Sequence, residues 1–246
     1  MLKKCDFCTM EILSNDTRTI CFFSLNTDLE KTFICIQHYL YIKQRYPTKN
    51  AIILYDGLDN TYYRQIMFSK NQSYNIIAEA LSSKQSISVE DYIEYDFIIF
   101  DISQQNYNIY ESFLYNSQLI LVVNNNLTLH YKELELTRTV HKEIIDSQDG
   151  LKLFPVNYCN MVLNNFHFAA GNTQKQYNNL LEEVEDDNSA EISGILNLIE
   201  NKDISKLTDD ISYEVLFKKI DVILFPPEED EDDDELIYGD NYHTAK

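Results

Sequence analysis

Residues 19–60 constrain the fold more than any other part of this chain. They read TICFFSLNTDLEKTFICIQHYLYIKQRYPTKNAIILYDGLDN, and the apolar residues fall into three groups. The first and last groups predict short strands at residues 20–23 and 51–55. The middle group predicts a helix with an apolar stripe formed by Phe33, Ile36 and Leu40, and Ile42 falls outside that stripe. A strand, a polar loop, a helix and a second strand together predict a βαβ unit, the building block of parallel sheets.

The rest of the chain continues the alternation of strands and helices. Apolar runs predict strands buried on both faces of a sheet at residues 95–101 and 119–123, and further strands are expected at residues 156–163 and 192–198. Helical patterns are expected at residues 74–81, 110–115, 129–145, 172–184 and 213–224, with a short helix or turn at 89–94. The predicted fold class is therefore α/β: a doubly wound, mostly parallel sheet with helices on both faces.

Three regions can be distinguished from this pattern. Residues 1–18 form an N-terminal extension that contains a CxxC motif, and residues 19–225 form the α/β domain. Residues 226–246 begin with two prolines and continue with eight consecutive acids at 228–235, which predicts a disordered acidic tail.

The charge of the chain restricts the partners that it can bind. Twenty basic residues stand against 40 acidic ones, which leaves a formal net charge of −20. Because binding to the DNA backbone requires clustered lysine and arginine, direct non-specific DNA binding is not expected. No apolar run approaches the roughly 18 residues that span a bilayer, and the first residues do not resemble a signal peptide. We therefore expect a cytoplasmic protein without a membrane segment.

The predicted βαβ unit has the frame of a phosphate-binding unit but lacks its glycines. The loop between the first strand and the helix ends in Lys31 and Thr32, the pair that ends a phosphate loop, and the second strand ends in Asp56. A phosphate loop directs backbone N–H groups at the anion, and its glycines permit the required dihedral angles and the close approach. No glycine occurs between residues 19 and 56.

With these segments in order, residues 18–225 resemble the ParA/MinD family of deviant Walker ATPases, which segregate plasmids and chromosomes or position complexes. The segment TICFFSLNTDLEKT corresponds to the deviant Walker A motif, and YDFIIFD, which ends at Asp101, is similar to the Walker B strand. Three more segments resemble further strands of the family, each with the residues that directly follow the strand. They are AIILYDGLDN, LILVVNNNLTLHYKELELT and EISGILNLIENKDI.

The resemblance can be carried over residue by residue. The family motif reads Lys-Gly-Gly-x-Gly-Lys-Thr, so Asn26 stands in place of the signature lysine. Thr27, Asp28 and Glu30 stand in place of the three glycines. Two of these are acids, which would repel a triphosphate at short range. The candidate nucleotide-binding residues that remain are Lys31, Thr32, Asp56 and Asp101.

The resemblance implies a degenerate ParA-like protein, a pseudo-ATPase without catalytic residues. It would act through protein–protein contacts in DNA partition, positioning or regulation of a plasmid- or phage-type element. Family members dimerise, so a homodimer or a heterodimer with a related ATPase is implied. The alternative is an active ATPase that binds ATP and Mg²⁺ with a rearranged phosphate loop.

A second alternative depends on cysteine and histidine. Cys5 and Cys8 form a CxxC motif, and Cys35 and His38 form a CxxH motif. Three thiolates and one imidazole suit a tetrahedral structural zinc ion. In this interpretation residues 1–45 resemble a treble-clef zinc finger and the protein is a zinc-stabilised adaptor. Alternatively, Cys35 is a small buried residue of the helix and His38 is an ordinary histidine.

Overall fold

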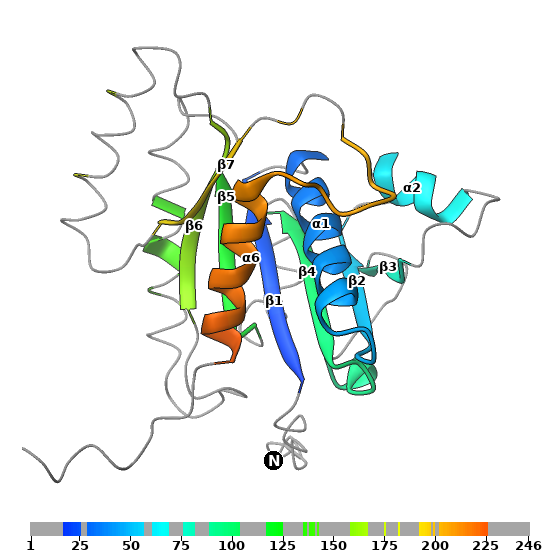
Figure 1. The fold of residues 1–246 in the computed structure, drawn as a ribbon. Coiled ribbons are helices and arrows are strands. Elements are labelled where there is room, and N and C mark those ends of the chain that lie inside the picture. Colours follow the sequence, from blue (N-terminus) through cyan, green and yellow to red (C-terminus); the bar gives the residue numbers. More distant parts are fainter. Residues whose placement is uncertain are drawn as a thin grey trace, which may run out of the picture.

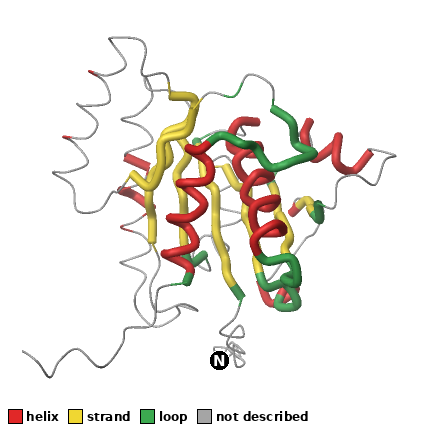
Figure 2. The backbone as a smooth tube through the Cα atoms, viewed as in Figure 1, coloured by secondary structure: helices red, strands yellow, loops and turns green. Residues whose placement is uncertain are grey.

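The structure is a computed structural model. It describes residues 17–25, 29–56, 61–68, 76–81, 89–103, 117–124, 158–166, 192–197 and 202–225, and single residues in three further segments (135, 136, 138–140, 142, 175, 182 and 199). Figures 1 and 2 show these parts as one sheet with helices packed against it. The N-terminal extension up to residue 16 and the acidic tail after residue 225 lie outside the described residues.

The sheet contains seven strands in the order β3-β2-β4-β1-β5-β6-β7. All neighbouring strands pair in parallel. The strands are β1 (Arg18–Ser24), β2 (Ala51–Tyr55), β3 (Ala78–Ala80), β4 (Phe97–Ser103), β5 (Leu119–Asn124), β6 (Tyr158–Phe166) and β7 (Ile192–Asn197). The predicted parallel α/β fold is confirmed.

Six of these strands lie where the sequence predicts them. Residues of β2, β4 and β5 are buried throughout, which explains why they appear as unbroken apolar runs. Side chains alternate between the two faces: Ile20 and Phe22 of β1 contact one core, and Cys21 and Phe23 contact the other.

Two long helices cover one face of the sheet, α1 (Leu29–Arg45) and α6 (Ile211–Leu224), which lie side by side in Figure 1. Residues 31–39 of α1 are all buried, because the sheet, α2 and α6 surround this helix. Ile42, which the predicted apolar stripe leaves out, is also fully buried. A single stripe therefore underestimates how much of α1 the core covers.

The opposite face of the sheet forms a second core. It consists of alternate side chains of the central strands together with Leu136 and Val140, which have helical backbone. Both residues belong to the helix predicted at residues 129–145, most of which lies outside the described residues. The helix predicted at residues 110–115 also lies outside them, as does nearly all of the helix predicted at 172–184.

The helix predicted at residues 74–81 is wrong for the described part of that segment. Residues 78–80 form β3, an edge strand that pairs with β2 from Ile53 to Tyr55. Ala-Glu-Ala favours a helix locally, but pairing with an exposed strand edge satisfies its backbone groups. Among the described residues of this part of the chain, α2 (Thr61–Phe68) is helical, and the short element η2 (Val89–Tyr92) is helical as predicted.

The strand order reverses at β1, which has β4 on one side and β5 on the other. In open parallel sheets the crevice at the carboxyl ends of the strands, next to such a reversal, is the usual ligand position. The start of α1 and the ends of β2 and β4 meet at this edge, and all four candidate nucleotide-binding residues lie there.

Candidate functional site at the carboxyl edge of the sheet

Lys31 and Asp101 form a buried ion pair at this edge. Lys31 lies in the first turn of α1, and its Nζ is 2.8 Å from Oδ1 of Asp101 on β4. The same ammonium donates a hydrogen bond to the carbonyl oxygen of Ile102 at 2.6 Å. The two side chains are only 1% and 3% exposed, so both charges are removed from water and depend on each other.

Two hydroxyl groups complete the surroundings of Asp101. Thr32 donates a hydrogen bond to Oδ2 of Asp101 at 2.7 Å, and Tyr63 of α2 donates to the same atom at 2.8 Å. The Tyr63 ring stacks on Tyr55 with 3.9 Å between ring centroids. The sequence alone did not reveal Tyr63, because its segment carries no recognised motif and no helix is predicted there.

Asp56 lies next to this network and holds the end of β4. Its Oδ2 accepts hydrogen bonds from the backbone N–H and from the hydroxyl of Ser103, at 2.7 and 2.8 Å. Its own N–H donates to the carbonyl of Asp101. The structure thus brings Lys31, Thr32, Asp56 and Asp101 together, and their polar groups contact protein atoms.

Two groups of the network, Lys31 and Tyr63, have raised pKa values. Burial disfavours the charged form of Lys31, but the nearby carboxylates of Asp101 and Asp56 outweigh it and raise its pKa. Burial, followed by the charge of Asp101, raises the pKa of Tyr63 well above its usual value, so its hydroxyl remains a donor. Because the pKa of Lys31 is raised on folding, protonated Lys31 stabilises the folded protein. This stabilisation is fully present below the ordinary lysine pKa and is lost only as pH rises through the raised value.

Glu30, which stands at the third glycine position of the family motif, makes an ion pair of its own. Its carboxylate lies 2.7 Å from Nζ of Lys202, in the segment between β7 and α6. The pair places a carboxylate directly before Lys31 at the start of α1. Asn26, Thr27 and Asp28 lie outside the described residues.

The proposed zinc ligands are only partly described. Cys5 and Cys8 lie outside the described residues, whereas Cys35 and His38 belong to α1. Burial raises the pKa of the Cys35 thiol well above its usual value, which disfavours the thiolate that zinc requires. Within the described ranges, no group of three or more Cys, His, Asp or Glu residues is arranged to hold a metal ion.

His38 is fully buried among aromatic rings. It packs against Phe22, Tyr41 and Phe217, with ring centroids 5.1–6.3 Å away. Neither ring nitrogen has a hydrogen-bond partner among the residues that the structure describes. Burial lowers the pKa of His38 to about 3, so the imidazole is neutral over the physiological range.

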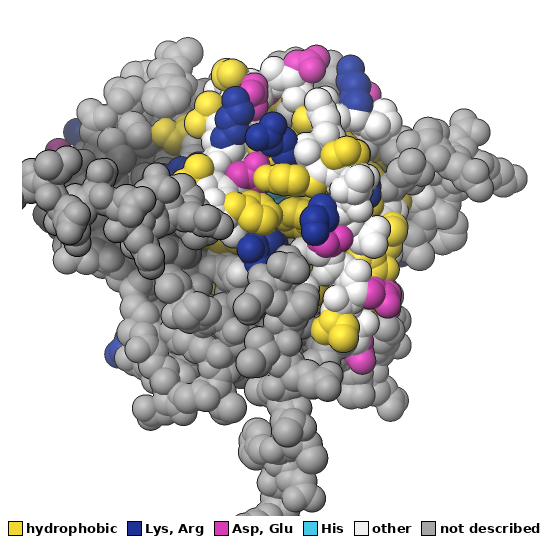
Figure 3. All heavy atoms as spheres, turned by 60° about the horizontal axis from the view of Figure 1, so that its bottom comes forward, with side chains coloured by type: hydrophobic (Ala, Val, Ile, Leu, Met, Phe, Trp, Pro, Cys, Tyr) yellow, Lys and Arg dark blue, Asp and Glu magenta, His cyan; other side chains and the backbone are white. Residues whose placement is uncertain are grey.

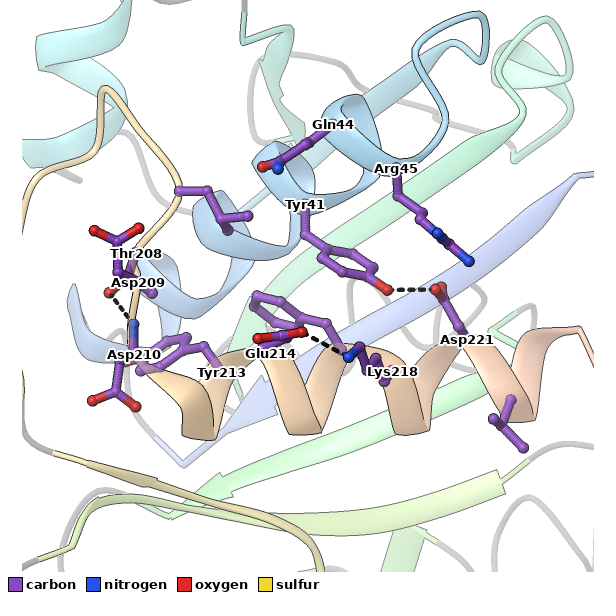
Figure 4. Close-up of a pocket in the computed structure, with 13 residues that line it drawn as sticks. Tyr41, Gln44, Arg45, Thr208, Asp209, Asp210, Tyr213, Glu214, Lys218 and Asp221 are labelled. Atoms are coloured by element: carbon purple, nitrogen blue, oxygen red, sulfur yellow. Dashed lines mark hydrogen bonds and ion pairs between the residues drawn. The ribbon is translucent and has the colours of Figure 1, made fainter.

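A groove of about 1040 Å³ separates the outer parts of α1 and α6 (Figure 4). Tyr41 of α1 reaches across it and donates a hydrogen bond to Asp221 of α6 at 2.6 Å. Beside the groove, α6 exposes three apolar side chains, Ile211, Val215 and Val222, which are 57–65% accessible to solvent. Their spacing of four and seven residues places them on one side of the helix.

The segment before α6 is tied to α1 by a buried amide. The side chain of Gln37 donates hydrogen bonds to the carbonyls of Asp203 and Lys206 and accepts one from the N–H of Thr208. Asp210 then caps α6 by accepting a hydrogen bond from the N–H of Ser212. These contacts fix the position of one wall of the groove.

No helix in the described part of the chain combines the length and the apolar character needed to cross a bilayer. No protein-family model matches the sequence, and no curated protein matches it either.

Solved structures with the same arrangement do exist. The structure of pNOB8 ParA bound to nonspecific DNA is 11% identical with a TM-score of 0.54, and the match covers 84% of this chain and 98% of that one. A plasmid partition protein from Borrelia burgdorferi B31, bound to AMPPNP, is 14% identical with a TM-score of 0.52, covering 83% and 98% of the two chains.

The MinC:MinD cell division complex of Aquifex aeolicus provides a third match, 14% identical with a TM-score of 0.50, covering 82% of this chain and 93% of that one. At such low identities the likeness concerns the fold. The chain has the α/β fold of the ParA/MinD ATPases.

Proposed function

We propose that this chain is a degenerate ParA-like protein that acts through contacts with other proteins in DNA partition or positioning, without hydrolysing ATP. The observation that carries the proposal is the buried contact between Lys31 and Asp101, with an N–O distance of 2.8 Å. A phosphate-binding lysine turns its ammonium toward the β- and γ-phosphates, and the following threonine turns its hydroxyl toward Mg²⁺. Here both groups bind Asp101 instead.

The surroundings of Lys31 do not fit a bound triphosphate and its metal ion. Glu30 places a carboxylate one residue before Lys31, and Lys202 is paired with that carboxylate. The Asp101 oxygen that accepts from Thr32 also accepts from Tyr63, so a metal ion that bound directly to this oxygen would have to compete with these two hydrogen bonds. We therefore assign the network a structural role and derive no catalytic step from it.

The groove between α1 and α6 supports the second half of the proposal. The same helix, α6, exposes Ile211, Val215 and Val222, of which Val222 also lines the groove, and exposed apolar side chains grouped on one helix face are typical of protein contact sites. A homodimer, or a heterodimer with a related ATPase, would place a partner on the molecule without requiring nucleotide.

Calorimetric titration of ATP with Mg²⁺ into the purified full-length protein tests the proposal. We expect no saturable heat up to about 1 mM ATP, and no hydrolysis above the buffer rate. The Lys31→Ala variant, although less stable, should likewise show no saturable heat. Saturable, Mg²⁺-dependent binding that disappears in Lys31→Ala would instead establish the alternative, an active ATPase with a rearranged loop.

The zinc-stabilised adaptor is tested on the same sample by elemental analysis. One zinc ion per chain, with loss of the folded state in Cys5→Ser, would support a metal site at the N-terminal extension. A sample without zinc that folds normally would leave residues 1–18 without that role.

A further inference from the structure

The outer face of α6 concentrates exposed apolar side chains. In the part of the chain that the structure describes, six large apolar side chains are more than a third exposed, and three of them, Ile211, Val215 and Val222, belong to α6. A fourth, Phe225, directly follows this helix. In Figure 1 the sheet lies behind α6, so the outer face of the helix points away from the core.

The exposed residues of α6 have the spacing of a helix-pairing seam. Five residues of the helix are exposed, and four of these are separated by four, three and four positions: Ile211, Val215, Lys218 and Val222. An alternation of three and four is the heptad spacing along which two helices pack against each other. We call these four residues the α6 seam. The core uses the opposite side of the helix, with Tyr213, Leu216, Phe217, Ile220 and Leu224 buried.

Lys218 is the one polar member of the α6 seam. Its Nζ lies 2.6 Å from a carboxylate oxygen of Glu214, one turn earlier on the same helix, and the two side chains are 66% and 50% exposed. A single lysine in an otherwise apolar seam lowers the stability of a helix pair, but it selects which positions face each other. Its stem can cover apolar surface while the ammonium remains in water.

The α6 seam matches a second copy of itself when the two helices run in opposite directions. Ile211 then faces Val222 of the second copy, and Val215 faces the stem of the second copy's Lys218. Because Glu214 directly precedes Val215, its carboxylate lies within reach of that ammonium, and each helix supplies both signs of charge. A parallel pair would instead place the two Lys218 ammoniums in one layer, where they repel each other.

The charges around the α6 seam are nearly balanced. The described charged residues of α6 and of the adjacent groove are three bases, Arg45, Lys218 and Lys219, and four acids, Asp209, Asp210, Glu214 and Asp221. Two of these acids are engaged within the molecule, because Asp210 accepts a hydrogen bond from the N–H of Ser212 and Asp221 accepts one from Tyr41. Figure 3 shows side chains of both charges mixed around apolar ones on the described part of the face in view.

We propose that two copies of this chain associate through their α6 seams in antiparallel orientation. The inference rests on the proposed function, action through protein contacts, and it specifies the partner and the contact surface. Screening limits the repulsion between molecules of net charge −20 to about 8 Å at about 0.15 M salt, so the balanced charge near the seam matters most. A contact made mainly by one helix of each copy is small, and we expect a weak dimer.

The pattern of the α6 seam favours a second copy over a different protein. A partner helix would need apolar residues at heptad spacing, together with a base and an acid one turn apart. The α6 helix of a second copy has this combination, since its Glu214 and Lys218 are four positions apart within the same apolar seam. Every molecule therefore carries both the surface and its complement.

Sedimentation equilibrium of the full-length protein without nucleotide tests the proposal. We expect a dimer whose fraction rises with concentration between about 5 and 500 µM. Val215→Glu and Val222→Glu should each raise the dissociation constant by about 10-fold or more, because each places a carboxylate in the apolar seam. Both positions are exposed, so the fold should persist, and circular dichroism checks this. The matched control is Ile93→Glu, at an apolar residue 53% exposed outside α6, which should leave the dimer unchanged.

A substitution that strengthens the dimer provides a second measurement. Lys218→Leu removes the only polar member of the seam and should lower the dissociation constant by about 10-fold. Lys219→Leu makes the same change in charge one position away from the seam and should have little effect. Equal effects of the two lysine substitutions would contradict the heptad contact.

Cysteine pairing tests the orientation of the two helices. In a mixture of the Val215→Cys and Lys218→Cys variants, we expect a disulfide between the two variants to form faster than in either variant alone. The natural sequence provides the background from its own cysteines. Faster pairing of Lys218→Cys with itself would overturn the antiparallel orientation.

Failure of this inference can be distinguished from failure of the proposed function. A monomer at all these concentrations, or a dimer that neither glutamate variant weakens, would overturn the α6 contact and leave the result of the ATP titration unaffected. A dimer that forms only with ATP and Mg²⁺ would overturn both the α6 contact and the proposed lack of nucleotide binding.

Discussion

The ammonium of Lys31 is held by two oxygen atoms of β4, one from a side chain and one from the backbone. Asp101 in turn accepts hydrogen bonds from Thr32 and Tyr63, so the carboxylate has partners from α1 and α2. A buried charge whose partner is removed is far less stable than a buried pair. These side chains therefore join three elements at the edge where a ligand would bind.

Removing one member of the ion pair should destabilise the protein strongly. We expect Lys31→Met and Asp101→Asn each to lower the free energy of unfolding by about 3–5 kcal/mol, because each leaves the other group buried without its counterpart. The double variant should lose clearly less stability than the sum of the losses in the two single variants. Urea unfolding followed by circular dichroism measures all three.

An exposed ion pair provides the matched control. Lys218 pairs with Glu214 on α6 at 2.6 Å, but its side chain is 66% exposed. Lys218→Met should change the stability by no more than about 0.5 kcal/mol. If Lys31→Met were equally harmless, the network would have no structural role.

His38 predicts a specific dependence of stability on pH. Its pKa is about 3 in the folded protein and about 6.5 when unfolded, so only the unfolded chain binds a proton between these values. Protonation of His38 in the unfolded chain should therefore lower the free energy of unfolding by about 1.4 kcal/mol for each pH unit below roughly 6. His38→Leu should remove that contribution, which urea titrations at pH 7, 6 and 5 detect as a shallower pH profile. An unchanged profile would mean that His38 is not buried among these rings.

At the scale of the elements, the close contact between β7 and α6 sets the position of the closing helix. A Cβ atom added to Gly194 would lie 2.9 Å from Cδ1 and 3.3 Å from Cβ of Leu216, which is fully buried on α6. Glycine permits this close approach, since a side chain here would force Leu216 or the helix to shift.

Gly194→Ala should destabilise the protein by about 1–3 kcal/mol through overpacking, as measured by urea unfolding. Combining it with Leu216→Val should recover part of the loss, because valine lacks the atom that the new methyl group would meet. Val215→Ala, at an exposed position of the same helix, should stay within about 0.5 kcal/mol. Full additivity of Gly194→Ala and Leu216→Val would contradict the contact.

At the scale of the whole molecule, the charge separates this chain from one of its structural neighbours. The pNOB8 ParA structure contains nonspecific DNA, whereas this chain has a net charge of −20. The two share a fold, and a fold alone does not specify binding.

We expect no shift of a nonspecific DNA duplex by this protein at about 10 µM and about 0.15 M salt, since non-specific binding depends on neutralising phosphates with basic residues. An electrophoretic mobility assay with pNOB8 ParA as the positive control measures this. Salt-sensitive binding of the natural sequence at micromolar concentration would show that local basic groups outweigh the overall charge.

The sequence by itself determined the fold class, the position of the βαβ unit and six of the seven strands. The residues of β2, β4 and β5 are buried throughout, so these strands appear in the sequence as apolar runs, and that signal is local. The resemblance to ParA/MinD rested on the order of such segments, and the fold confirms it. The sequence also identified Lys31, Thr32, Asp56 and Asp101 as residues at one edge of the sheet.

Only the tertiary structure decided how those residues are used. The strand at residues 78–80 exists because β2 offers a free edge, which local helix propensity does not reveal. Tyr63 joins Asp101 across 38 positions of sequence, and His38 lies neutral among rings contributed by β1, α1 and α6. A motif specifies residue types and spacing, whereas burial and the partners of a charge depend on segments that meet only in the folded chain.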